Sequence, residues 1–183
     1  CYTPEIYEQL REFQRQGTDA DTKLAEQIPW LRTYIAGGTA ALEHYLGTRE
    51  EIAFDQINQV ISQFKEGKEE LWLKRMGKED VDVWFQKKDF SNIGIMILEW
   101  THGNSDELKG IDFPVYLNST PQETMEFRKA RNRNQNADSP FVTRVLEIEQ
   151  RKLYQQAHKA RIVLSREGKI IPWKEGEENE YKK

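Results

Sequence analysis

The residue best suited to covalent chemistry is the single cysteine of the chain, and it stands at position 1. A thiol that shares a residue with a free amine can act as a nucleophile. Alternatively, Cys1 carries the lipid of a bacterial lipoprotein, or it simply follows a removed initiator Met. We expect lipid attachment at Cys1 and therefore a location at the bacterial envelope, with a cytoplasmic location as the alternative. One cysteine excludes an internal disulfide and any metal site built from several cysteines.

Positive charge is concentrated in the last third of the chain, although the net charge is −4. Residues 1–127 hold 13 Lys and Arg against 23 Asp and Glu, whereas residues 128–174 hold 12 against 4. Such a concentration can attract phosphates or anionic lipid head groups. The residues predicted to bind a polyanion are Arg128, Lys129, Arg131, Arg133, Arg144, Arg151, Lys152, His158, Lys159 and Arg161.

Two other interpretations of these basic residues remain open. Arg144, Arg151 and His158 recur every seven residues and so share one helix face, which could be an ordinary solvated surface. The same face could instead dock on the acidic N-terminal helices of this chain. We place the solvated surface first, because basic nucleic-acid-binding domains usually have a high overall pI and this chain has a pI near 5.6.

No other pattern in the sequence predicts catalysis, a metal site or a nucleotide-binding loop. His102 precedes Asn104 and Asp106 in a polar stretch that typically only turns the chain. Asp80 and Asp82 lack the spacing of a calcium-binding loop. We therefore expect neither a metal nor a cofactor.

The N-terminal third is predicted to be helical. Its apolar residues recur at helical spacing, and Thr, Pro and Gly stand where helices begin and end. Pro29 should kink or divide the second helix, and Gly37-Gly38 should form a joint. Thr48 and Glu51 match a capping box at the start of a further helix. The predicted helices cover Thr3–Gly17, Asp21–Ile35, Thr39–Leu46 and Thr48–Gly67.

The middle of the chain changes from helical to strand-like patterns near Gly77. A short helical piece is expected over Glu69–Arg75. Period-two alternation predicts a half-buried strand over Val81–Phe85, and a continuous apolar run predicts a buried strand over Ile93–Trp100. Phe113–Leu117 should form a shorter strand, because Pro114 cannot donate a ladder hydrogen bond.

The last third is predicted to be helical again. Thr120 and Glu123 match a second capping box, and Ser139-Pro140 should begin a long helix that continues to Leu164. The alternative for its end is a hairpin formed by residues 161–165 and 169–173 around Gly168. We favour the helix, because the apolar stripe extends to Leu164.

These patterns together predict an α+β protein that is mainly helical. It has an N-terminal helical group, a small antiparallel sheet in the middle and two C-terminal helices. We expect one domain over residues 1–173 and a charged tail over 174–183. The sequence has no apolar run near the ~18 residues that a membrane-spanning helix needs.

For function, the sequence favours a non-catalytic interaction or accessory protein, anchored to a membrane by lipid on Cys1. The expected partner is a protein. The first alternative is a nucleic-acid- or polyanion-binding protein that uses the basic helices, and the second is an enzyme with Cys1 as its nucleophile.

Overall fold

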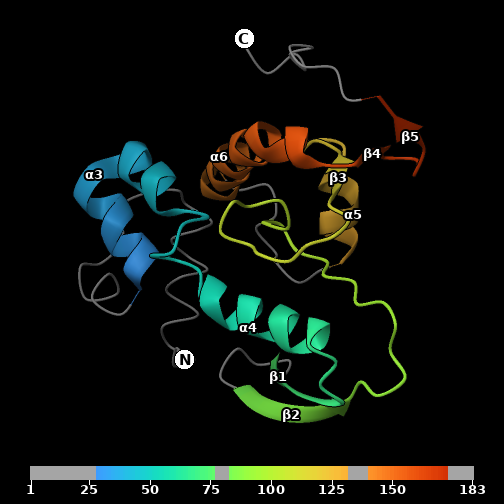
Figure 1. Cartoon of the computed structure of the whole chain (residues 1–183). Helices are drawn as coiled ribbons and strands as arrows, with labels where there is room; N and C mark the ends of the chain where they lie inside the picture. Colours follow the sequence, from blue (N-terminus) through green and yellow to red (C-terminus); the bar gives the residue numbers. More distant parts are fainter. Residues whose placement is uncertain (1–27, 77–82, 132–139, 173–183) are drawn as a thin grey trace.

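The computed structural model describes residues 28–76, 83–131 and 140–172 (Figure 1). The predictions for Cys1, Arg133, the first helix and the C-terminal tail lie outside the described residues. The fold is α+β, as the sequence predicts. Its elements are α3 (Pro29–Tyr45), α4 (Phe54–Lys65), β1 (Glu70–Met76), β2 (Val83–Asp89), β3 (Val115–Asn118), α5 (Met125–Ala130), α6 (Pro140–Gln156), the 3-10 turn η1 (Ala157–Lys159), β4 (Ile162–Ser165) and β5 (Ile170–Ile171).

Helix α3 begins at Pro29 and is interrupted at Gly38. Pro29 is the first helical residue, where no backbone N–H is required, and Ile28 before it is extended, so a kink inside a continuous helix is wrong. The alternative, a division into two short helices, depends on residues 21–27, which lie outside the described residues. At Gly38 the backbone takes φ 62° and ψ −152°, which side-chain-bearing residues rarely adopt. The predicted joint between two helical pieces is therefore confirmed at Gly38.

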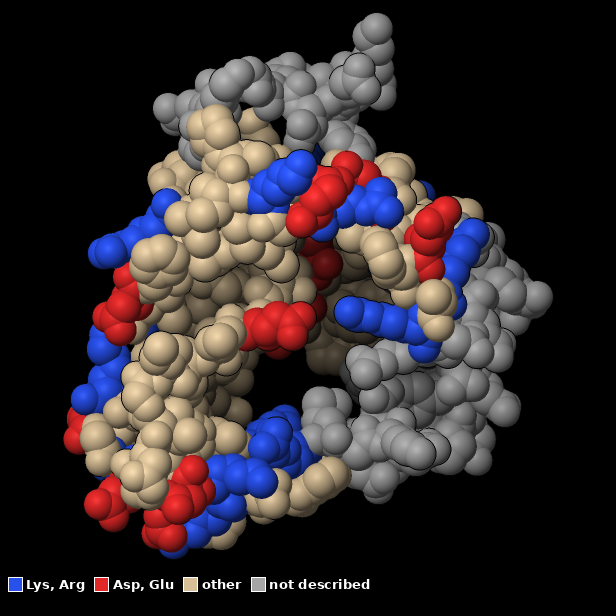
Figure 2. Space-filling view, turned by 90° about the vertical axis from the view of Figure 1, so that its right-hand side faces the viewer, with Lys and Arg blue, Asp and Glu red and all other residues tan. Residues whose placement is uncertain are grey.

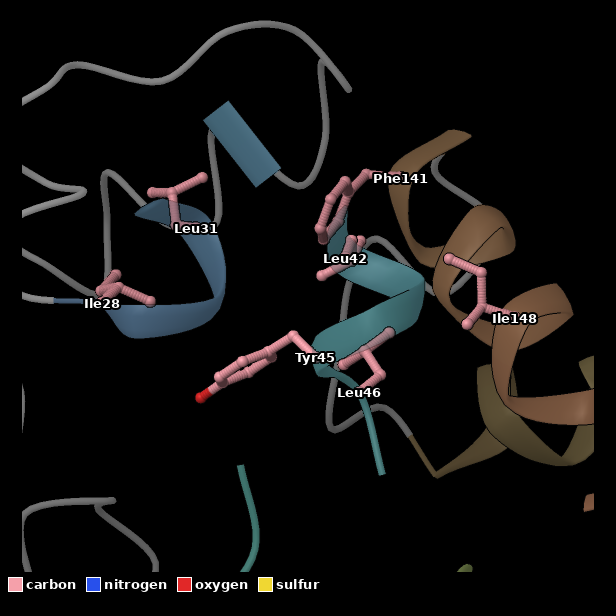
Figure 3. Packing of buried hydrophobic residues seen from close by; sticks show 7 residues of the cluster. All are labelled: Ile28, Leu31, Leu42, Tyr45, Leu46, Phe141 and Ile148. Atoms are coloured by element: carbon pink, nitrogen blue, oxygen red, sulfur yellow. The ribbon is translucent and has the colours of Figure 1, made fainter. Parts of the chain in front are cut away.

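The largest apolar cluster joins α3 to α6 (Figure 3). The Trp30 and Phe141 rings stack with centroids 5.1 Å apart, and Tyr34 meets Phe141 edge-on. Burying each large aliphatic or aromatic side chain stabilises the fold by about 1.5–3 kcal/mol. The buried members of the cluster are Ile28, Leu31, Leu42, Tyr45, Leu46, Phe141 and Ile148.

The predicted capping box at Thr48 is wrong, because α4 begins only at Phe54. The Thr48 hydroxyl donates to the carbonyl of Tyr45 (2.7 Å), and the Glu51 carboxylate accepts the N–H of Gly47 (2.6 Å). Gly47 takes φ 71°, which turns the chain at the end of α3. Both side chains therefore close the turn after α3 instead of starting α4.

Strand β1 occupies the segment that was predicted to be a short helix, so that prediction is wrong. It pairs antiparallel with β2, with Leu73 opposite Gln86. The strand predicted from Val81 is present as β2, but Trp84 and Phe85 are both exposed, so β2 is not half-buried as expected. A helical propensity over Glu69–Arg75 yields here to cross-strand pairing, which local sequence does not reveal.

The Ile93–Trp100 segment is extended and apolar but is not a strand in this structure. Ile95 and Ile97 are 81% and 86% exposed, so the prediction of a buried strand is wrong. On the opposite face, Met96 and Trp100 pack on the cluster around Phe54 of α4. Half of this segment therefore has an apolar neighbour and half has none among the described residues.

A second small sheet has the order β3-β4-β5 and is separate from the hairpin (Figure 1). Strand β3 is present as predicted and lies parallel to β4, with Tyr116 opposite Val163, whereas β4 and β5 are antiparallel. Helix α6 ends at Gln156 and the backbone of Ala160 is extended. The continuous helix to Leu164 is therefore wrong, and the alternative hairpin is correct.

The capping box formed by Thr120 and Glu123 is confirmed by two reciprocal hydrogen bonds. The Thr120 N–H donates to the Glu123 carboxylate (2.8 Å), and the Glu123 N–H donates to the Thr120 hydroxyl (3.1 Å). The turn that they close leads into α5 at Met125. No helix in the described ranges has the length and apolar character needed to cross a membrane.

Candidate functional site

The basic side chains on one face of α6 contact α3. Arg144 donates to the Tyr34 hydroxyl, and its guanidinium lies 5.7 Å from the centre of the Tyr34 ring. Arg151 forms an ion pair with Glu43 at 3.1 Å. Tyr34 and Glu43 both belong to α3. The basic face therefore docks on a helix of the same chain, but α3 carries one Arg and one Glu and is not itself acidic.

The basic residues near the end of α6 also contact other parts of the chain. Lys159 forms an ion pair with Asp106 and donates to the carbonyl of Asn104 (3.2 Å). The guanidinium of Arg161 lies 5.7 Å from the centre of the Phe113 ring. Lys159 and Arg161, which follow α6, therefore help to fix the 104–113 loop.

At the end of α5 the basic residues lie in a different environment. Arg128 donates to the carbonyl of Pro121 (2.6 Å), whereas Lys129 and Arg131 are exposed. His158 is exposed, with its Nδ1 2.8 Å from the carbonyl of Gln155. In Figure 2 acidic side chains lie among the basic ones on the face shown. The structure thus does not gather the predicted residues into one basic surface on that face, and polyanion binding remains a prediction.

A group of ionisable side chains lies where α6 meets the end of α3 and the loop that contains His102. His102 is 5% exposed, and its Nε2 is 4.0 Å from the Glu149 carboxylate of α6. Lys152, one turn further along α6, donates its ammonium to the carbonyl of Leu46 at the end of α3. His102 is buried and Glu149 and Lys152 are half-buried, so each loses part of its hydration.

Gly47 allows the His102 ring to approach the end of α3. A Cβ on Gly47 would lie 2.8 Å from Cε1 of His102, which is closer than real side chains come. The positive φ of Gly47 also disfavours any other residue. The turn after α3 therefore positions both His102 and Glu51. Burial has the largest effect on the pKa of His102 and on that of Glu149, and the negative charge of Glu51 raises both pKa values.

Burial changes the proton affinity of each member of the group. It raises the pKa of Glu149 to about 7, with a further increase from the Glu51 carboxylate and an opposing effect of Lys152. Burial also lowers the pKa of His102 and that of Lys152. A carboxyl group with a pKa near 7 can hold or release a proton at neutral pH, as a general acid or base must.

Glu149 also lies on the wall of a large hollow in the molecule. The hollow has a volume of about 1170 Å³ and is bounded by α4, α6, β3 and the Gly94–Asn104 segment. On the face in Figure 2, uncharged side chains and both Lys or Arg and Asp or Glu side chains lie around a hollow. At the carboxyl end of β3, Oδ1 of Asn118 is buried without a hydrogen-bond partner among the described residues. The described parts contain no group of three or more potential metal ligands.

Sequence reasoning missed this group. Glu149 was visible only as a charged interruption in the apolar stripe of α6, and His102 was assigned to a turning loop. A charged residue at a core position is the signal that could have identified it. The contact between His102 and Glu149 could not be foreseen, because it joins a loop and a helix that are distant in sequence.

Comparison with known proteins shows that this chain is similar to part of an enzyme. Over 140 residues, which are 76% of this chain, it matches the bifunctional alpha-galactosidase/sucrose kinase AgaSK of Mediterraneibacter gnavus. In that stretch 47% of the residues are identical. The chain spans about 15% of the length of this relative. No family model matches the sequence, and no solved structure matches it.

This similarity corrects the function expected from the sequence. A non-catalytic interaction or accessory protein is contradicted, because the relative is a bifunctional enzyme and the match covers most of this chain. The assignment as a lipoprotein is contradicted for the same reason. The error arose because position 1 and the charge distribution were the unusual features of the sequence, and neither indicates catalysis.

Proposed function

We propose that this chain is part of a sugar kinase, and that it takes part in transferring a phosphoryl group from a nucleoside triphosphate to a sucrose-like sugar. The similarity to AgaSK carries this proposal, because 47% identity over 140 residues is far more than a shared fold requires. Of the two activities in the name of that relative, α-galactosidase and sucrose kinase, the charge of this chain favours the kinase.

Phosphoryl transfer depends mainly on positioning and on cations that neutralise the phosphates. Residues 128–174 carry 12 Lys and Arg against 4 Asp and Glu. Lys129 and Arg131 are exposed basic side chains at the end of α5, inside this most basic part of the chain. We therefore assign phosphate contacts to Lys129 and Arg131.

The sequence contains no GxxxxGK[ST] loop, whose backbone N–H groups cradle phosphates in many kinases. In this proposal the chain contributes cations, and Glu149 contributes a carboxyl group that can exchange a proton near pH 7. Another part of the enzyme supplies the remaining nucleotide contacts. Glu149 is suited to accept a proton from a sugar hydroxyl.

A chimera tests the proposal. The matched stretch of AgaSK is replaced by the corresponding residues of this chain, and sucrose phosphorylation and galactoside hydrolysis are assayed separately. We expect the double variant Lys129→Gln/Arg131→Gln to lower kcat/KM for phosphorylation by roughly tenfold or more, since charge-assisted hydrogen bonds contribute about 1.5–3 kcal/mol. Hydrolysis should stay unchanged.

The matched control is Lys74→Gln/Lys87→Gln, which removes two cations from the exposed β1–β2 hairpin. It should leave both activities unchanged. If the Lys129/Arg131 variant lowers galactoside hydrolysis and spares phosphorylation, this segment serves the other activity and the proposal is wrong.

A further inference from the structure

The Gly94–Trp100 segment has the side-chain pattern of a sheet strand that lacks neighbours. Its apolar residues point alternately to two faces, one packed on α4 through Met96 and one carrying the exposed Ile95 and Ile97. An apolar residue on both faces is typical of a strand inside a parallel sheet, which is covered on both sides. The exposed face therefore lacks an apolar cover.

Strand β3 is an edge strand of its sheet among the described residues. It pairs with β4 on one side only, in parallel, and Leu117 is 61% exposed. Parallel pairs rarely stand at an open, solvent-exposed position in small sheets. An edge strand is a template for another strand. On β3 the carbonyl of Val115 accepts from the side-chain amide of Asn104 (3.1 Å) and that of Leu117 accepts from the N–H of Ser119 (3.1 Å), so an incoming strand would replace these local contacts.

Both segments line the same hollow, and neither forms a strand pair with the other. Ligand pockets usually enclose about 300–1,000 Å³ and carry a few polar groups that converge on the ligand. This hollow measures about 1170 Å³, and its wall includes the apolar residues of two extended segments. Its size and lining suit a segment of polypeptide.

We propose that a β-strand from another part of the same enzyme inserts between Gly94–Trp100 and β3 and joins them into one sheet. The proposal rests on the proposed function only in taking a larger enzyme as the source of the strand. The match covers 15% of AgaSK, so most of an enzyme of that length lies outside the matched stretch. The inserted strand is apolar on both faces, because its side chains would lie beside Met96 on one face and beside Ile95 and Ile97 on the other.

Hydrogen exchange measured by mass spectrometry tests this insertion. The amides of residues 94–100 and 115–118 are compared between the isolated 183-residue chain and the AgaSK chimera. We expect exchange at these amides to be slower in the chimera by at least about 100-fold, because paired and buried amides exchange only on local unfolding. The aligned residues of unmodified AgaSK provide the same measurement in an enzyme that folds without grafting.

Two variants separate insertion from a general effect on folding. Ile95→Lys and Ile97→Lys should hardly change the melting temperature of the isolated chain, in which both side chains are exposed, and should lower that of the chimera. Phe85→Lys is the control. Phe85 is 62% exposed on β2, away from the hollow, and its replacement should affect neither protein.

Equal exchange rates in the isolated chain and in the two enzymes would overturn the proposal. So would slow exchange in the isolated chain together with dimers in sedimentation, because the occupant would then be a second copy. The exchange measurement does not depend on kinase activity. A chimera that protects these amides but does not phosphorylate sucrose therefore contradicts the proposed function and supports the insertion.

Discussion

At the residue scale, Glu149 is the side chain whose environment departs furthest from what its type prefers. It occupies a position in the apolar stripe of α6, faces His102 across 4.0 Å and is subject to the Glu51 charge. Lys152 only partly offsets the lost hydration, so burial dominates and the carboxyl group tends to keep its proton. Groups with such shifted proton affinity are concentrated at functional sites.

The shifted pKa of Glu149 predicts a pH-dependent effect of Glu149→Gln. Folding raises the pKa of this carboxyl group from 4.5 to about 7, so the folded state binds more protons and the free energy of unfolding falls between these two pH values. Gln resembles the protonated form and does not ionise. From pH 5 to pH 8, the free energy of unfolding of Glu149→Gln should therefore rise relative to that of the native chain by on the order of 2–3 kcal/mol.

Urea unfolding at the two pH values measures this gain. The shift at His102 is present in both proteins and cancels in the difference. Glu147→Gln is the control, because Glu147 is exposed on the same helix. An equal pH dependence for Glu149→Gln and the native chain would contradict the assignment of this titration to Glu149.

At the element scale, α6 is attached to α3 by apolar packing and by two adjacent cations in different environments. Arg151 meets Glu43 at the surface, with side chains 53% and 42% exposed. Lys152 is partly buried and donates to the backbone carbonyl of Leu46. Water screens the ion pair between Arg151 and Glu43. Lys152 instead supplies a hydrogen-bond donor to a backbone carbonyl at the end of α3.

The two neighbouring cations should therefore contribute unequally to stability. Arg151→Gln should lower the free energy of unfolding by less than about 1 kcal/mol. Lys152→Met keeps most of the apolar stem but removes the charged donor, and should lower it by about 1.5–3 kcal/mol. Denaturant unfolding of both variants measures the difference, and equal losses would show that the carbonyl of Leu46 does not depend on Lys152.

At the scale of the whole molecule, the buried apolar residues form three clusters among the described residues. One joins α3 and α6, one lies around Phe54 of α4, and one surrounds Tyr116 of β3. Helix α6 contributes Ile148 to the first and Leu153 to the third, whereas the β1–β2 hairpin has Leu71 as its buried hydrophobic residue. Stability should therefore differ between regions.

Native-state hydrogen exchange of the isolated chain should show this difference. Amides in the middle of α6 should exchange only on global unfolding, and amides of β2 should exchange at a lower opening free energy, because few apolar contacts hold the hairpin. Equal opening free energies for α6 and β2 would indicate that the hairpin and the helix unfold as one unit.

The sequence by itself determined the elements that local chemistry specifies. Pro140 occupies the first turn of a helix, Gly38 joins two helical pieces, and Thr120 with Glu123 closes a turn. The α+β class followed from the apolar patterns of these segments. Each of these features depends on residues a few positions apart, so the printed sequence contains all its causes.

Tertiary structure alone decided the features that need a partner from elsewhere in the chain. Strand β1 exists because β2 pairs with it, and Ile162–Ser165 leaves the helix because β3 offers a parallel edge. Glu149 meets His102 only where a loop and α6 come together. The free energy of such contacts depends on residues far apart in sequence, so local patterns could at most offer them as alternatives, as for the hairpin around Gly168.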